Sequence, residues 1–113
     1  MIKTSLLETQ VTTFSPQGYL SAANAGKFLQ ELTQLVQSPA TSPLLIDMKE
    51  VDFMDSAGLM ALIEAFRLAQ ELEKELSICS VAPSVRMIFE LTQLDRVFDI
   101  FDSKDSFISK TVK

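Results

Sequence analysis

The chain has 113 residues, of which 47% are hydrophobic and 22% charged, a composition that fits one globular domain with a packed core. Ten basic residues against 15 acidic ones give a net charge of -5, so the chain lacks the basic surface that binds nucleic-acid phosphates. We therefore expect a single domain over residues 1–113, with no nucleic acid as a direct partner.

No segment has the roughly 20 consecutive apolar residues that span a bilayer, and residues 1–10 lack the apolar centre of a signal peptide. We therefore expect a cytoplasmic protein with no membrane insertion. The single cysteine, Cys79, lies in an alternating apolar segment, which predicts a buried structural thiol rather than a redox centre.

The first third of the chain predicts a hairpin and a helix. Residues 6–14 mix β-branched and polar side chains, and residues 15–18, Ser-Pro-Gln-Gly, supply a turn before a second short strand. Ser21 has the side chain of a helix N-cap, and apolar residues then recur at helical spacing over residues 25–36. We expect this amphipathic helix to end before Pro39.

The middle of the chain predicts a buried strand and the strongest helix. The almost continuously apolar run at residues 44–48 suits a strand that is covered on both faces at the centre of a sheet. A weaker strand-like segment follows at residues 51–54. From Ser56 to about Glu73, apolar side chains share one helical face while charged ones share the other.

The last third continues the alternation of strands and helices. Residues 76–82 alternate between apolar and small side chains as a strand does, and Pro83 marks the start of a helix. Residues 97–101 predict a short strand, and Asp102 can cap a final helical segment. This order of elements argues for a mixed sheet whose later strands are joined by helical crossovers.

The start of the strongest helix carries the candidate functional residues. Asp55 or Ser56 can cap the free backbone N–H groups there. Capping does not explain Gly58, which costs about 1 kcal/mol relative to alanine in a helix and suggests close approach by another group. A step of about 100° per residue places Met60 near Ser56, with Ala57 close by. A docking surface and a simple capped helix start both fit this pattern.

The segment at residues 55–59, Asp-Ser-Ala-Gly-Leu, resembles the signature of the STAS domain in anti-sigma factor antagonists. In that family an acidic strand end is followed by Asp-Ser-x-Gly-Leu at the start of a helix. The similarity covers nearly the whole chain, including residues 18–20, 45–47 and 91–98. It implies an α/β chain with the STAS (SpoIIAA-like) fold, a mixed four- to five-stranded sheet with helices packed mainly on one face.

The resemblance also implies a function in the regulation of transcription by partner switching. In the family, the serine that matches Ser56 is phosphorylated by a cognate anti-sigma factor that is itself a serine kinase, and the unmodified form binds that kinase. A serine phosphatase that acts on phospho-Ser56 is the second implied partner. The family turn often reads Gly-x-Leu-Asp, but here Ser21 replaces the aspartate. The expected partner-binding residues are Asp55, Ala57, Gly58, Met60, Ser21 and Asn24.

Enzyme and cofactor functions find little support. Met54 occupies the first glycine position of the hydrolase motif Gly-x-Ser-x-Gly, and no histidine is present to deprotonate a serine. The aspartates at positions 47, 52 and 55 lack the spacing of a calcium loop and predict a solvated acidic loop. The three glycines are too far apart for a phosphate loop. We expect a protein that is not an enzyme and holds no metal or cofactor.

One alternative stays open after the resemblance is considered. A STAS domain can also be a subunit that does not switch, and that binds a small ligand or assembles a lipid-transport or stress-signalling complex. Fold resemblance alone does not separate the two functions. The retained Asp55, Ser56 and Gly58 favour the phosphorylation switch.

Overall fold

The computed structural model describes residues 11–38 and 43–111. Residues 6–10, which the sequence places in the first strand, lie outside this range. The elements in chain order are β1 (Thr12–Phe14), β2 (Gly18–Leu20), α1 (Ala25–Gln37), β3 (Leu44–Asp47), β4 (Val51–Met54), α2 (Ser56–Glu71), β5 (Leu76–Cys79), α3 (Pro83–Leu91), the 3-10 helix η2 (Leu94–Arg96), β6 (Ile100–Phe101) and α4 (Lys104–Thr111).

The described strands form two sheets, one of four strands in the order β1-β3-β5-β6 and one of two strands, β2 and β4. Every strand pair in these sheets is parallel. In the larger sheet, Leu45 of β3 lies opposite Thr13 of β1 and Ser77 of β5. All four residues of β3 are buried, which confirms the predicted central strand.

The predicted hairpin of the first two strands is wrong, because β1 pairs with β3 while β2 pairs with β4. The turn residues bend the chain but do not reverse it. Gly18 adopts a left-handed φ of +79°, and its N–H donates to the carbonyl oxygen of Glu50 at 2.8 Å instead of returning to β1. The first segment therefore runs onward along the molecule, from the large sheet to the small one.

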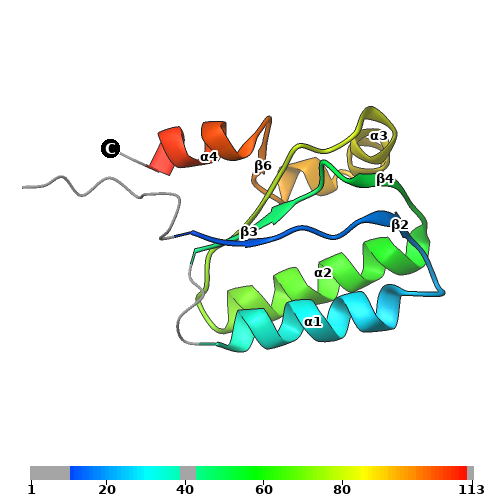
Figure 1. The fold of residues 1–113 in the computed structure, drawn as a ribbon, viewed down its shortest axis with the longest axis horizontal. Helices are drawn as coiled ribbons and strands as arrows, with labels where there is room; N and C mark the ends of the chain where they lie inside the picture. Colours follow the sequence, from blue (N-terminus) through cyan, green and yellow to red (C-terminus); the bar gives the residue numbers. More distant parts are fainter. Residues whose placement is uncertain (1–10, 39–42, 112–113) are drawn as a thin grey trace, which may run out of the picture.

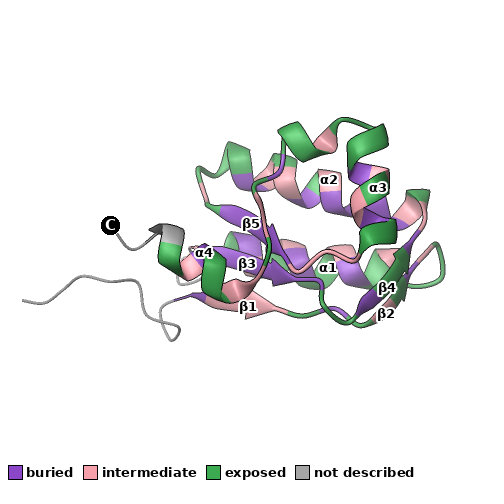
Figure 2. Cartoon of the chain, turned by 90° about the horizontal axis from the view of Figure 1, so that it is seen from above, coloured by how far each residue is buried: buried purple, intermediate pink, exposed green. Residues whose placement is uncertain are grey.

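The helices form unequal layers around the larger sheet (Figure 1). α1 and α2 lie side by side on one face, and the buried side chains of α3 belong to the same core cluster as theirs. On the opposite face, Phe107 of α4 packs in a smaller cluster with Val11, Leu45 and Cys79. This arrangement confirms the α/β fold class with helices mainly on one face. Figure 2 shows the continuous burial of β3 and β5 between these layers.

Cys79 is fully buried, as the sequence predicts. Burial away from water raises the pKa of its thiol, because the charged thiolate is poorly solvated there. Among residues 11–38 and 43–111, no helix combines the length and the apolar character needed to cross a bilayer.

Two predicted boundaries need correction. The N-cap of α1 is Asn24 rather than Ser21, because residues 21–24 first form a turn in which the Ser21 carbonyl accepts hydrogen bonds from the N–H groups of Asn24 (3.0 Å) and Ala25 (2.7 Å). The last strand is also shorter than predicted. Phe98 lies before it and packs edge-to-face in the core against Phe89, with ring centroids 5.4 Å apart.

Candidate functional site

The Asp55 side chain joins two turns at one end of the molecule. Its Oδ1 accepts hydrogen bonds from the N–H groups of Ala57 (2.9 Å) and Gly58 (3.2 Å), so Asp55 is the N-cap of α2. Its Oδ2 accepts from the N–H of Ala22 at 3.4 Å, and its own N–H donates to the Leu20 carbonyl at 3.0 Å. The turn before α1 and the turn before α2 therefore lie side by side. We call this region the Ser56 corner, made of residues 19–24 and 53–60.

Gly58 explains how these two turns come so close. A Cβ atom at this position would lie 2.6 Å from the carbonyl oxygen of Leu20 and 2.8 Å from its Cβ, distances that side chains do not tolerate. The close approach that the sequence suggests is therefore made by the chain itself. Gly58 is buried, and its lack of a side chain lets β2 pack directly against the start of α2.

The structure brings Ser21 and Asn24 to the same corner. The Asn24 side chain accepts a hydrogen bond from the Ser21 N–H at 2.9 Å and donates one to the Tyr19 carbonyl at 2.6 Å. These bonds hold the turn in shape, while the Asn24 side chain stays exposed and Ser21 is half-buried. The contact of either residue with a partner stays a prediction.

Ser56 itself is exposed on the first turn of α2. Within the described chain its hydroxyl has no hydrogen-bond partner, and the cap of the helix is Asp55. Met60, one helical turn later on the same side, keeps 52% of its surface exposed, and Ala57 is half-buried. The corner thus presents an accessible hydroxyl beside an apolar side chain.

Two aromatic residues of the corner were not among the predicted site residues. Tyr19 of β2 and Phe53 of β4 lie opposite each other in the small sheet, with 63% and 45% of their surfaces exposed. Their rings meet edge-to-face, with centroids 6.0 Å apart. Strand periodicity is the signal that could have found them, because each precedes a residue whose side chain enters the core, Leu20 or Met54.

The acidic residues do not form one solvated loop. Asp47 is buried and accepts a hydrogen bond from the Lys49 N–H at 3.1 Å, and the Lys49 ammonium lies 3.7 Å from its second oxygen. Asp52 is exposed and Asp55 half-buried, so the predicted solvated loop is wrong for Asp47. In the part of the chain that the structure describes, no group of three or more acidic or cysteine side chains is placed to hold a metal ion.

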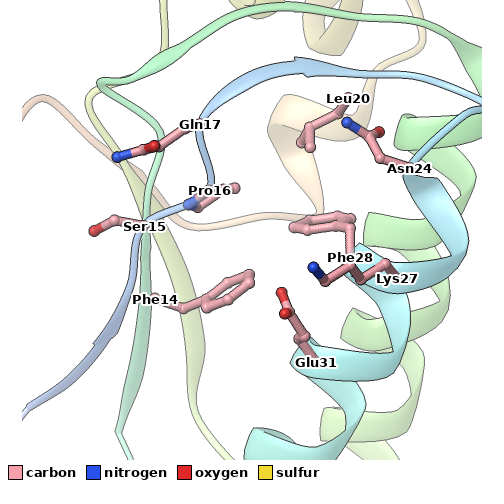
Figure 3. Close-up of a pocket in the computed structure, with 9 residues that line it drawn as sticks. All are labelled: Phe14, Ser15, Pro16, Gln17, Leu20, Asn24, Lys27, Phe28 and Glu31. Carbon is pink, nitrogen blue, oxygen red and sulfur yellow. The ribbon is translucent and has the colours of Figure 1, made fainter.

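A pocket of about 340 Å³ opens beside the corner, between α1 and the loop that joins β1 to β2 (Figure 3). The rings of Phe14 and Phe28 are stacked with centroids 5.9 Å apart. Lys27 and Glu31 of α1 line its side, and Asn24 links it to the corner. The sequence does not predict this pocket, because its walls come from segments that only the fold brings together.

The sequence matches a known protein family. The family model of the STAS domain matches residues 6–107, so the chain belongs to the STAS domain family. Among its relatives, the anti-sigma-B factor antagonist of Listeria monocytogenes is 30% identical over 83 residues, which are 74% of this chain and 72% of that protein.

Solved structures share the fold at lower identity. The phosphorylated form of the Bacillus cell fate determinant SpoIIAA has a TM-score of 0.70 and 15% identity, over 92% of this chain and 94% of that one. A sulfate transporter family protein from Wolinella succinogenes has a TM-score of 0.77 and 15% identity, over 90% and 84% of the two chains. Because proteins with such different names share it, the fold alone does not decide the function.

Proposed function

We propose that the protein is a cytoplasmic anti-sigma factor antagonist whose unphosphorylated form binds an anti-sigma factor with serine kinase activity. Phosphorylation of Ser56 switches this binding off, and a serine phosphatase restores it. The observation that carries the proposal is the exposed Ser56 hydroxyl, which has no hydrogen-bond partner in the described chain and stands on the first turn of α2. The antagonist name of the Listeria relative supports the same function.

The site favours a switch that keeps the fold. A phosphate adds about -1.5 to -2 charges at pH 7, and the N–H groups and dipole at a helix N-terminus favour such a charge. The fold does not depend on the Ser56 hydroxyl, because Asp55 caps the helix. We therefore expect phosphorylated and unmodified protein to unfold at nearly the same temperature.

At an interface the same phosphate is unfavourable. It would have to lose water next to the carboxylate of Asp55 and beside the apolar surface of Ala57 and Met60. A partner that covers this corner binds the unmodified form and rejects the phosphorylated one. The switch acts through charge and steric hindrance at the contact surface, without rearrangement of the domain.

The test uses the purified protein, ATP and each anti-sigma serine kinase of the same cell, purified one at a time. Phosphate is located by mass spectrometry, and kinase affinity is measured by calorimetry before and after the reaction. We expect a single phosphate on Ser56 and an affinity at least ~100-fold lower, which is about 2.7 kcal/mol. Ser56→Ala should take up no phosphate, whereas the control Ser109→Ala, an exposed serine on α4, should react as the parent does. Phosphate on another residue would contradict the proposal.

The pocket beside α1 favours the second candidate, a STAS subunit that binds a small ligand and does not switch. Its volume of about 340 Å³ is near the lower end of small-ligand sites, and Phe14 and Phe28 stack beside it. The same experiment separates the two functions. A protein whose Ser56 stays unmodified by every kinase, and which purifies from its cell within a lipid-handling complex, would favour the second candidate.

A further inference from the structure

The small sheet carries aromatic surface that the fold does not use. Tyr19 and Phe53 touch each other edge-to-face, yet 63% and 45% of their surfaces remain exposed. A cross-strand aromatic pair stabilises a sheet by only about 0.2 to 1 kcal/mol, so its contribution to folding is small. Tyrosine is also enriched among the residues that dominate binding energy in protein interfaces.

The pair lies within one contact area of Ser56. Leu20 follows Tyr19, and its carbonyl accepts the hydrogen bond from Asp55 that fixes the corner. Phe53 precedes Ser56 by three residues, which is about 10 Å at a strand rise of 3.3 Å per residue. A typical interface covers about 800 Å² of each partner, so a protein centred on Ser56 extends far enough to cover both rings.

The charges around the rings indicate the chemistry of the partner. Glu50 and Asp52 are exposed in β4 and the turn before it, and Asp55 closes the corner on the other side. The ammonium of Lys49 lies 3.7 Å from the carboxylate of the buried Asp47, although 64% of the lysine side chain is exposed. A matching surface therefore combines an apolar recess with a rim of lysine and arginine side chains.

We propose that Tyr19 and Phe53 are the anchor that recognises the anti-sigma kinase, by entering an apolar recess with a basic rim on that protein. This inference rests on the proposed function and extends it. The aromatic pair supplies affinity and partner choice, whereas the Ser56 phosphate removes binding. Affinity and switching therefore belong to different residues of the same corner.

The experiment separates the anchor from the switch by measuring binding in a Ser56→Ala background, in which the switch residue cannot be modified. The probe is the purified kinase that binds the parent protein in the calorimetric assay. The double variant Tyr19→Ala/Phe53→Ala should bind the kinase at least ~30-fold more weakly than the Ser56→Ala protein does. The single variant Tyr19→Phe keeps the ring and should retain most of the affinity. Asp52→Lys should weaken binding several-fold, with the loss concentrated in the association rate at low salt.

The matched control is Leu72→Ala, which also removes an exposed apolar side chain, 42% accessible, just beyond the other end of α2. Sixteen residues at 1.5 Å each place it about 24 Å from Ser56, so its binding should equal that of the parent. Circular dichroism on all variants checks that the fold is intact.

Each outcome has one meaning. Selective loss of binding in the aromatic variants supports the anchor. Normal binding by the double alanine variant, with Ser56 still phosphorylated in the parent, overturns the anchor and leaves the proposed function standing. Binding that depends on the rings while no kinase modifies Ser56 supports the anchor and overturns the switch. Failure of every kinase to bind the parent overturns both.

Discussion

The two sheets are both parallel, but they meet solvent differently. In the larger sheet, β3 and β5 are buried at every residue between helices on both faces. In the smaller sheet, β4 is buried only at its two ends, and Phe53 in its middle is exposed. Apolar residues in the middle of β3 and β5 therefore lie in the core, whereas Tyr19 in the middle of β2 and Phe53 in the middle of β4 face solvent. Whether helices cover the sheet face, more than the strand itself, decides whether an apolar side chain stabilises the core or stays available for binding.

Paired alanine variants offer the largest test of this contrast. Ile46→Ala in β3 removes a fully buried side chain and should lower the free energy of unfolding by about 2 to 5 kcal/mol, whereas Phe53→Ala in β4 should cost less than about 1 kcal/mol. Urea denaturation measures both values. If the two losses were equal, Phe53 would contribute to stability as a core residue does and the contrast would be lost.

The junction between the small sheet and α2 gives the next effect. Gly58→Ala forces a methyl group against the Leu20 backbone and should destabilise the protein by about 1 to 3 kcal/mol. Gly26→Ala is the control, since a Cβ there meets nothing within 4 Å and should leave the stability equal or raise it by up to about 1 kcal/mol. Opposite signs for the two variants, from thermal or urea unfolding, would locate the close contact at Gly58 alone.

The smallest effect belongs to the cap. Asp55→Ala removes the acceptor for the first N–H groups of α2 and for Ala22, and should cost about 1 kcal/mol. Asp55→Asn keeps a side-chain oxygen and should lose less than half of that amount. Amide hydrogen exchange at Ala57 and Gly58 should rise in the alanine variant and change little in the asparagine variant. Unchanged exchange in both would show that the cap does not hold the corner.

Much of the fold is encoded in local patterns. The apolar run at residues 44–48 predicted the central strand, and the periodicity after Ser56 predicted α2, because burial on both faces or on one helical face leaves a direct trace in the sequence. The predicted hairpin is wrong because strand pairing here is set by long-range contacts that leave no local pattern. Pro16 and Gly18 show that the chain bends, but the pairing of β2 depends on β4, more than 30 residues away.

The sequence predicted the site best where a residue's role follows from its position at the start of a helix. The sequence predicted that Asp55 or Ser56 caps α2, and the structure assigns the cap to Asp55 and leaves Ser56 on the first turn. Strand alternation separates Tyr19 and Phe53 from their neighbours Leu20 and Met54, but the sequence does not show which of the two faces the rest of the fold covers. The burial of Asp47 was missed as well, since its hydrogen bond and ion pair with Lys49 form only in the folded turn.

The buried cysteine makes the molecule convenient to label. The thiolate is the reactive form, and burial both raises the pKa of Cys79 and shields the sulfur from reagents. A second cysteine introduced at the exposed Ser109 of α4 would therefore react alone, with Cys79 left in place. α4 and the β2–β4 sheet lie at opposite ends of the long axis (Figures 1 and 2). A dye or a sensor surface attached through α4 thus leaves Ser56 and both aromatic rings facing the solution.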